Sequence, residues 1–269
     1  MEINRNNISQ IVNNSNARPD KDYGQNFLVE PEVCKRIVDA LEIKENEKVL
    51  EIGPGLGSLT HFLNEQTNDL TIVDIDERMI AFLKLIYKVN IVQEDIRKHN
   101  VSGYDKIIGN LPYNITSETI VYLLLNSIKA KKIVLMIQSD ALPHFIDVSG
   151  KEYGPASVLL HLLGNPKRLF NVKPGCFYPA PKCGSSVFEV VINPVTDLSK
   201  AKEVYLFAKS LFLNRRKTIY NNLQNYLKNK EIAGILLEKC QINSNSRPED
   251  ISPKQYLKLY EEYQLSLSK

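Results

Sequence analysis

Apolar residues recur along the first two thirds of the chain in two alternating patterns. Short continuous apolar runs, typical of strands buried on both faces, occur at residues 48–52, 70–75, 90–92, 106–109, 132–138 and 185–192. Between them, residues 59–65, 78–87 and 117–125 carry apolar side chains at helical spacing, and another helical pattern begins near residue 30. This alternation predicts an α/β domain with a mostly parallel sheet and helices on both faces.

The pattern changes after Pro194, where apolar residues follow helical spacing without further strand-like runs. They include Val204, Phe207, Ala208, Leu211, Leu223, Leu227, Ile235 and Leu236. The first 20 residues are rich in Asn and Ser and show little apolar periodicity. We therefore expect a flexible tail over residues 1–20, an α/β domain over 21–195 and a small helical domain over 196–269.

Charge is distributed unevenly between these parts. Residues 196–269 contain 13 Lys and Arg against 8 Asp and Glu, whereas the remainder contains 21 against 23. The basic excess of the C-terminal domain suits an anionic partner, and Arg215, Arg216 and Lys217 are its candidate phosphate contacts. No apolar run is long enough to span a membrane, and the N-terminus resembles no signal peptide. We expect a cytoplasmic protein that does not associate with membranes.

The four cysteines give no sign of metal or disulfide chemistry. Cys34, Cys176, Cys183 and Cys240 are scattered, without a C-x-x-C motif or paired histidine spacing. We expect reduced thiols and no metal site.

The first motif with chemical content is VLEIGPGLGSLT at residues 49–60, a strand that runs into a glycine-rich loop and a helix. Gly53, Gly55 and Gly57 would let the backbone approach a ligand closely. The spacing G-x-G-x-G differs from the dinucleotide pattern G-x-G-x-x-G. Glu51, at the end of the strand, belongs to the same candidate site.

Acidic residues follow the next two strands. Asp74 is placed to accept hydrogen bonds from both ribose hydroxyls of a nucleoside ligand, with Ile75 beside it. Asp95 could accept a hydrogen bond from the amine of the ligand's adenine while the backbone at Ile96 contacts the ring. A helix-capping role is the alternative. For Asp76 we expect only a solvated position at the start of a helix.

The motif NLPY at residues 110–113 follows the apolar strand KIIG and has no common structural explanation. The N6 amine of adenine is a poor nucleophile because its lone pair is delocalised into the ring. Two acceptors, the side-chain oxygen of Asn110 and the carbonyl of Pro112, would favour a pyramidal nitrogen whose lone pair can attack a methyl group. Tyr113 offers a face on which a flipped-out base can stack. Positioning and electrostatic matching would supply most of the acceleration.

Together these features resemble class I methyltransferases that act on adenine N6. Four further segments resemble the ribosomal RNA adenine dimethyltransferase family, and within it the bacterial small-subunit enzymes. They are YGQNFLVEPEV (23–33), CFYPAPKCGSSVFEV (176–190), FLNRRKTIYNNL (212–223) and RPEDISPKQYLKLY (247–260). The resemblance covers residues 23 to 263.

The resemblance implies a Rossmann-like class I fold, S-adenosylmethionine as cofactor, and two methylations on each of two adjacent adenines near the 3′ end of small-subunit rRNA. Gln25, Asn26, Leu28 and Asn110 would contact the cofactor, and Phe177 would close over the target base opposite the tyrosine. The partner would be the immature 30S particle, with the basic C-terminal domain gripping the RNA. We expect a monomer.

Some positions depart from the family pattern, and alternatives remain. Ser139 and Asp140 stand where a basic residue and Glu are usual, Cys183 replaces a Val, and the N-terminal tail is weakly basic. None of these departures touches the methyl-transfer geometry, and Ser139, Asp140 and the tail are the ones expected to affect RNA docking. Alternatives are a large-subunit rRNA methylase of the macrolide-resistance type, an RNA-binding assembly factor and, remotely, a nucleotide-linked dehydrogenase.

Overall fold

The computed structural model describes residues 1–15, 17–20, 24–112 and 115–267. It divides into two compact units, one formed by Met1–Leu142 and Lys167–Ile192 and the other by Pro143–Pro166 and Asn193–Lys269. The change of unit at residue 193 lies close to the boundary expected at 195. Residues 143–166, however, belong with the C-terminal helices rather than with the α/β domain where we placed them.

The first unit contains a seven-stranded sheet with strand order β4-β3-β2-β5-β6-β9-β7. Its strands are β2 (Val49–Ile52), β3 (Leu70–Asp74), β4 (Asn90–Gln93), β5 (Lys106–Asn110), β6 (Lys132–Gln138), β7 (Gly164–Val172) and β9 (Ser185–Ile192). From β4 to β6 the pairs are parallel, and β9 runs antiparallel to β6. All four residues of β2 are buried, as expected for a strand covered on both faces.

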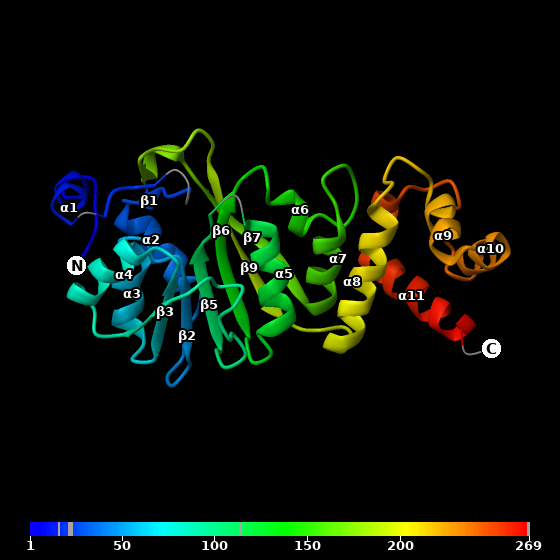
Figure 1. Cartoon of the computed structure of the whole chain (residues 1–269), viewed down its shortest axis with the longest axis horizontal. Helices are drawn as coiled ribbons and strands as arrows, with labels where there is room; N and C mark the ends of the chain where they lie inside the picture. Colours follow the sequence, from blue (N-terminus) through cyan, green and yellow to red (C-terminus); the bar gives the residue numbers. More distant parts are fainter. Residues whose placement is uncertain (16, 21–23, 113–114, 268–269) are drawn as a thin grey trace. The chain divides into compact units, whose positions relative to one another are not determined.

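Helix α2 (Pro31–Asp39) precedes β2, and α3 (Ser58–Gln66), α4 (Glu77–Ile86) and α5 (Thr116–Asn126) connect successive strands. Apolar side chains of α2, α3 and α4 share one core cluster with Val49, Ile72 and Val134 of the sheet. Strand neighbours of these residues are buried too, and α5 has its own buried apolar positions. The expected class I α/β architecture is confirmed (Figure 1).

The predicted flexible tail is wrong for the described residues of the N-terminal segment. Helix α1 (Ile8–Asn14) and its flanks bury Ile3, Ile8 and Val12 against a cluster that includes Phe27 and Met79. A seven-residue helix rich in Asn has little intrinsic stability. Burial of a few apolar side chains orders the segment, and so short a pattern is not visible in the sequence.

A two-stranded antiparallel ribbon joins segments that are far apart in the sequence. Strand β1 (Phe27–Leu28) pairs with β8 (Phe177–Tyr178), with Phe27 opposite Tyr178 and Leu28 opposite Phe177. The turn η1 (Pro174–Cys176) precedes β8, and the carbonyl of Cys176 accepts a hydrogen bond from the Val29 amide at 2.8 Å. The ribbon brings the N-terminal motif and the Phe-Pro segment together.

The regular structure of the second unit is helical, apart from the first three residues of β7. It contains α6 (Pro143–Ile146), α7 (Pro155–Leu163), α8 (Leu198–Phe212), α9 (Ile219–Leu227), α10 (Lys230–Lys239), the turn η2 (Pro248–Asp250) and α11 (Pro253–Leu267). Helix α7 is almost wholly buried and packs against α8, which explains why residues 143–166 join this unit. Side chains of Asp197, Thr218 and Asn229 cap α8, α9 and α10.

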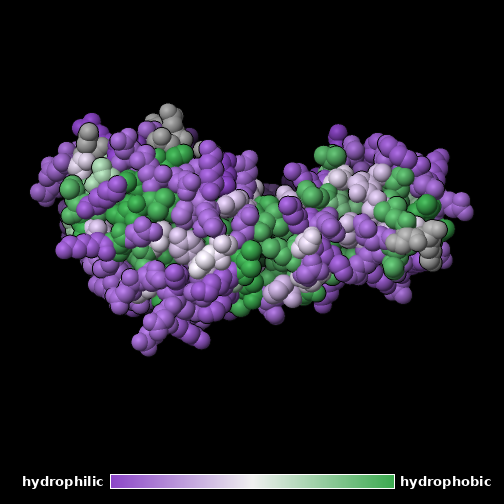
Figure 2. Space-filling view, turned by 60° about the horizontal axis from the view of Figure 1, so that its bottom comes forward, coloured by the Kyte–Doolittle hydropathy of each residue, from purple (hydrophilic) through white to green (hydrophobic). Residues whose placement is uncertain are grey.

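The outer surface is mostly hydrophilic on the face shown in Figure 2, with separate apolar patches between polar residues. Among the described residues, no helix is both long and apolar enough to cross a membrane.

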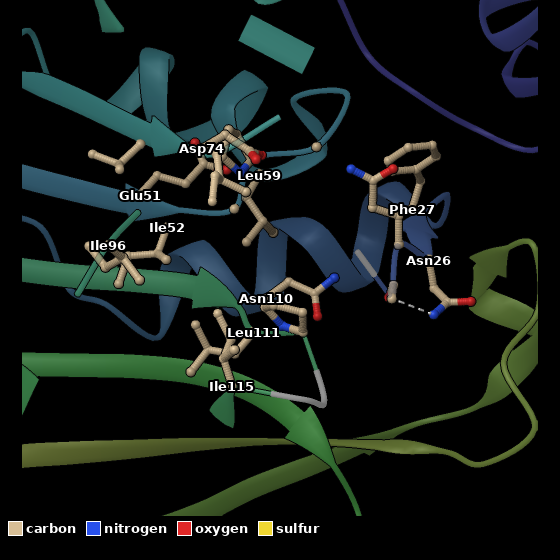
Figure 3. A pocket seen from close by; sticks show the side chains of 18 of the residues that line it. Asn26, Phe27, Glu51, Ile52, Leu59, Asp74, Ile96, Asn110, Leu111 and Ile115 are labelled. Atoms are coloured by element: carbon tan, nitrogen blue, oxygen red, sulfur yellow. Dashed lines mark hydrogen bonds between the residues drawn. The ribbon is translucent and has the colours of Figure 1, made fainter. Parts of the chain in front are cut away.

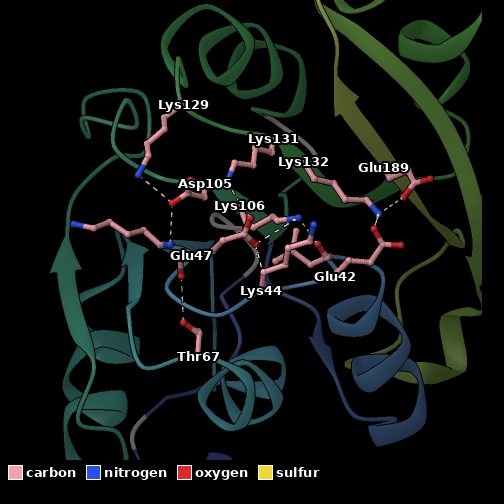
Figure 4. Close-up of polar contacts among 12 residues, drawn as sticks. Glu42, Lys44, Glu47, Thr67, Asp105, Lys106, Lys129, Lys131, Lys132 and Glu189 are labelled. Carbon is pink, nitrogen blue, oxygen red and sulfur yellow. Dashed lines mark hydrogen bonds and ion pairs between the residues drawn. The ribbon is translucent and has the colours of Figure 1, made fainter.

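Charged side chains are buried at the edge of the sheet where the parallel strands begin (Figure 4). Lys106 and Lys132 face each other in β5 and β6 and are only 5% and 6% exposed. The ammonium group of Lys132 lies 2.8 Å from the Glu189 carboxylate and 3.1 Å from that of Glu42. Lys106 lies 3.7 Å from the buried Glu47 carboxylate. Each buried cation therefore has an anionic partner, as burial of a charge requires.

Candidate functional site

A cavity of about 320 Å³ opens at the edge of the sheet where the parallel strands end (Figure 3). This volume is within the usual range of small-molecule sites. The expected cofactor residues that line it are Gln25, Asn26, Leu28, Glu51, Gly53, Gly55, Asp74, Ile75, Asp95, Ile96 and Asn110. Pro112 and Phe177 line it as well. The structure thus gathers residues from the ends of four strands, β2, β3, β4 and β5, and from the β1–β8 ribbon around one space.

Gly57 is the exception among the expected cofactor residues, because it does not line the cavity. It precedes α3 with a φ of +91°, and a Cβ atom there would come within 2.9 Å of Leu83 and 3.0 Å of Tyr87. The last glycine of the motif is therefore required by packing between α3 and α4. Gly53, with a φ of +63°, keeps the role of letting the backbone turn beside the ligand space.

Glu51 and Asp74, which have no basic partner within the part of the chain that the structure describes, define the acidic side of the cavity. Glu51 is fully buried, its Oε2 accepts a hydrogen bond from the Thr60 hydroxyl at 2.7 Å, and its Oε1 has no partner among the described residues. Burial, reinforced by the neighbouring Asp74 charge, raises the pKa of Glu51 to about 8. Burial also raises the pKa of Asp74 to about 6, despite a hydrogen bond from the Asp76 amide. An unpaired buried carboxylate suits a cationic ligand.

Asp76 organises one wall of the site, contrary to the solvated position that we expected. Its side chain caps α4 by accepting from the Arg78 amide, but it is only 3% exposed. The Arg78 guanidinium donates to both of its oxygens, at 2.9 and 2.7 Å, which lowers the pKa of the carboxyl against the effect of burial. The Gln25 amide also donates to Asp76, at 2.8 Å. Asp76 therefore holds Gln25 in position rather than serving as a solvated helix start.

Asp95 is held in the same way, in a second Asp-x-Arg arrangement. It accepts from the Arg97 amide at 2.9 Å and from the Arg97 guanidinium at 2.6 to 3.2 Å. The hydrogen bonds from Arg97 keep the pKa of Asp95 below its usual range. Arg97 also contacts Glu118 on α5. The carboxylate expected to meet a cofactor amine thus has most of its acceptor sites already used by Arg97.

Asn110 and Pro112 lie at the end of β5, next to the acidic side. The Asn110 side chain points from its strand end toward the side of the cavity where Asn26 lies (Figure 3). The Pro112 carbonyl already accepts hydrogen bonds from the Thr116 hydroxyl at 3.0 Å and from the Ile115 amide at 3.4 Å. Phe177 lines the cavity from β8. Tyr113 lies outside the described residues.

Several lining residues escaped the sequence analysis. Phe27, Leu59, Leu111 and Ile115 are apolar residues of the walls, and Arg97 is the guanidinium described above. The apolar residues look like ordinary core positions in the sequence. For Arg97 a signal exists, because D-x-R occurs after both β3 and β4.

The expected RNA-contacting residues follow α8 in the second unit. Arg215 is partly buried, and its guanidinium donates to the Lys151 carbonyl at 2.6 Å and pairs with Glu249 at 3.5 Å. Arg216 and Lys217 are exposed. Arg215 thus serves packing within its unit, whereas the other two are available for a ligand.

Among the described residues, no group of three or more His, Cys, Asp or Glu side chains could hold a metal ion.

Comparison with known proteins links this chain to one family. Residues 4–265 match the sequence model of the family described as ribosomal RNA adenine dimethylase. A protein named ribosomal RNA small subunit methyltransferase A from Malacoplasma penetrans is 37% identical, over 88% of this chain and 89% of the relative. The protein of the same name from Mycoplasma mycoides is 34% identical, over 89% of this chain and 96% of the relative.

Two solved structures share the fold over most of the chain. The dimethyladenosine transferase from Plasmodium falciparum has a TM-score of 0.76 at 24% identity, covering 89% of this chain and 98% of that one. The 23S rRNA methyltransferase ErmE has a TM-score of 0.69 at 21% identity, covering 89% and 100%. At these identities the likeness concerns the fold.

Proposed function

The chain belongs to the ribosomal RNA adenine dimethylase family, and from this premise we propose that it dimethylates the N6 amines of two adjacent adenosines near the 3′ end of small-subunit rRNA. The chain is an S-adenosylmethionine-dependent rRNA adenine dimethyltransferase. The choice of the small subunit is supported by the name shared by its relatives. The proposed partner is rRNA within the immature 30S particle, met by a monomer in the cytoplasm.

The cavity has the chemistry that this cofactor needs. S-adenosylmethionine supplies an electrophilic methyl group on a sulfonium ion. The observation that carries the proposal is the fully buried Glu51, whose Oε1 has no hydrogen-bond partner among the described residues and which faces a second carboxyl, Asp74. A cationic nucleoside would supply the missing positive charge. We assign Asp74 to its ribose, Asp95 and Ile96 to its adenine, and Gln25, Asn26 and Glu51 to its amino-acid end.

The substrate side of the proposal rests on the end of β5. The Asn110 side-chain oxygen accepts one N6 hydrogen of the target adenine, and the Pro112 carbonyl accepts the other. Since that carbonyl is now bonded to the Thr116 hydroxyl and the Ile115 amide, the substrate amine takes the place of one of them. Phe177 stacks on the base, and Tyr113 stacks on its other face. No strong general base is needed, because the nitrogen becomes acidic once it is alkylated.

The basic loop after α8 supplies the proposed contacts to the RNA backbone. Arg216 and Lys217 are exposed and can bind phosphates directly. Arg215, which is bonded to Lys151 and Glu249, supports the loop and contacts phosphate only with the part of its guanidinium that remains exposed.

The test is transfer of labelled methyl groups to three substrates, namely unmethylated small subunits, unmethylated large-subunit rRNA and mature small subunits. We expect dimethyladenosine only in the unmethylated small subunits, and its loss with Asn110→Ala. Asn193→Ala, which changes an exposed asparagine, is the matched control and should retain activity. Label in large-subunit rRNA would instead indicate a large-subunit rRNA methylase of the macrolide-resistance type. Tight binding without transfer would mean that the chain acts as an assembly factor.

A further inference from the structure

A second hollow lies in the first unit beside the cofactor cavity. Its volume is about 370 Å³, and its lining residues are Val12, Asn13, Arg18, Pro19, Asp20, Gln25, Tyr178 and Pro179. Gln25 lines both spaces, so the two are neighbours separated by its side chain. The roles assigned to the cofactor and to the target base leave this hollow unused.

One wall of the hollow continues the strand that carries Phe177. Side chains alternate along a strand, so Phe177 and the next residue, Tyr178, point to opposite faces of the β1–β8 ribbon. Phe177 is buried at the cofactor cavity. Part of the Tyr178 ring packs on the cluster around Phe27, and the remainder lines the second hollow. An aromatic face is therefore presented on each side of the ribbon.

The polar groups of the hollow differ in whether they have partners. The Gln25 amide donates to Asp76 at 2.8 Å and accepts from the Asp20 amide at 3.0 Å, so it is a fixed part of the wall. The Asp20 carboxylate pairs with Arg78. Arg18 is exposed and forms no ion pair within the part of the chain that the structure describes. Its guanidinium is the cation available to a ligand here.

An aromatic face, an available guanidinium and an exposed amide at Asn13 match the chemistry of a single nucleotide. Bases of unpaired RNA stack on aromatic rings, and arginine binds the phosphates between them. We propose that this hollow binds the nucleotide adjacent to the target adenosine, with its base on Tyr178 and its phosphate at Arg18. The inference rests on the proposed function and adds a second base subsite to it.

Extrusion of the target base gives this subsite a physical purpose. A base that enters the cofactor cavity leaves its neighbour without a stacking partner, and the loss of that stack costs free energy. A ring placed one step along the RNA replaces the lost stack. Because the two substrate adenosines are adjacent, each is the neighbour of the other. The subsite would therefore favour substrates in which two bases lie side by side in unpaired RNA.

The test combines protein variants with altered RNA. Small subunits are reconstituted with unmethylated rRNA in which one of the two adenosines is replaced by an abasic unit and the other remains as acceptor. A second preparation reverses the two positions, and an intact substrate is the reference. The enzymes are the wild type, Tyr178→Leu, Arg18→Gln and, as the matched charge control, Lys88→Gln at an exposed position between α4 and β4. Cofactor affinity of each variant checks the folded site.

On intact subunits we expect Tyr178→Leu to raise the KM for subunits about 5- to 100-fold, as loss of one stack implies. On one of the two abasic substrates the KM of the wild type should rise by a similar factor, whereas the KM of Tyr178→Leu should not rise further. Arg18→Gln should raise the KM for the intact and the abasic substrates by the same factor. Lys88→Gln should leave both KM values unchanged. A Tyr178→Leu effect that is absent, or equal on all three substrates, overturns the inference. Absence of transfer by the wild type would instead overturn the proposed function, and this subsite with it.

Discussion

The hydroxyl of Thr60 donates a hydrogen bond to Oε2 of Glu51 over 2.7 Å, while Oε1 of the same carboxyl group has no partner among the described residues. Nearby titratable groups, Asp74, Tyr87 and Cys34, offer no positive charge. The protein therefore holds a carboxyl group in the cavity that is easier to keep neutral than to ionise until a cation arrives.

This arrangement predicts how stability depends on pH. The folded-state pKa of Glu51, about 8, lies above its ordinary value of 4.5, so the folded state holds the proton more tightly. The stabilising contribution of the Glu51 proton to the free energy of unfolding is fully present below about pH 4.5. It is lost as pH rises from there through about 8. In denaturant unfolding of the ligand-free protein, the wild type should lose stability relative to Glu51→Gln across this range. A difference between the two proteins that does not change with pH would contradict the pKa assignment.

The hydrogen bonds that Asp76 accepts from Arg78 and Gln25 predict that its loss affects both stability and ligand binding. Asp76→Asn weakens bonds from Arg78 and Gln25 at a buried position, so we expect a loss of about 1.5–3 kcal/mol in unfolding free energy. Calorimetry should also show weaker S-adenosylmethionine binding, because Gln25 lines the cofactor cavity. Glu77→Gln, at the exposed neighbouring position, is the control and should change neither quantity appreciably. Unaltered cofactor affinity in Asp76→Asn would show that the hydrogen bonds of Asp76 do not contribute to cofactor binding.

A third prediction concerns Gly57. Alanine at this position combines a left-handed backbone with a Cβ atom too close to Leu83 and Tyr87, and we expect a loss of about 2–4 kcal/mol. Gly103→Ala has no atoms within 4 Å of the added carbon and should cost much less. Thermal unfolding of both variants measures the difference. Equal stability of the two would mean that α3 and α4 shift apart at little cost.

The buried charges at the opposite edge of the sheet give a fourth prediction. Lys132→Met leaves the Glu189 carboxylate without its nearest cation, and we expect a loss of about 3 kcal/mol. The double variant Lys132→Met/Glu189→Leu should recover most of it. Lys131→Met removes a side chain that is 61% exposed, and its ion pairs are screened by solvent, so it should cost much less than Lys132→Met. Urea unfolding measures all three. Methyl transfer should stay unchanged in the folded variants, since these residues lie away from the cavity.

The strands were the most predictable part of the fold. The expected runs 132–138 and 185–192 coincide with β6 and β9, because a strand buried on both faces requires continuous apolar sequence. Strand β7 escaped because only its first and last residues are buried and it contains polar residues. The membership of α7 in the second unit depends on packing against α8, and no local pattern in the sequence expresses such a contact.

The position of residues at the cavity was predictable where it depended on residue type after a strand, as for Asp74 and Asn110, which both line it. It was not predictable where two candidates of the same type compete for different roles. Asp74 and Asp76 are separated by one residue, and only the fold shows that Asp76 is bonded to Arg78 and Gln25. The use of the Pro112 carbonyl by Thr116 is likewise a matter of turn geometry.

The β1–β8 ribbon also has a consequence for biosynthesis. A ribosome releases the chain from its amino end, so Phe27 and Leu28 emerge long before their partners Phe177 and Tyr178. At ordinary elongation rates of roughly 5–20 residues per second, the interval is on the order of ten seconds. By the end of that interval the nascent chain can hold its glycine loop and the parallel strands β2 to β6, but it still lacks the wall that carries Phe177. A product that ends before residue 177 therefore lacks one wall of the cavity.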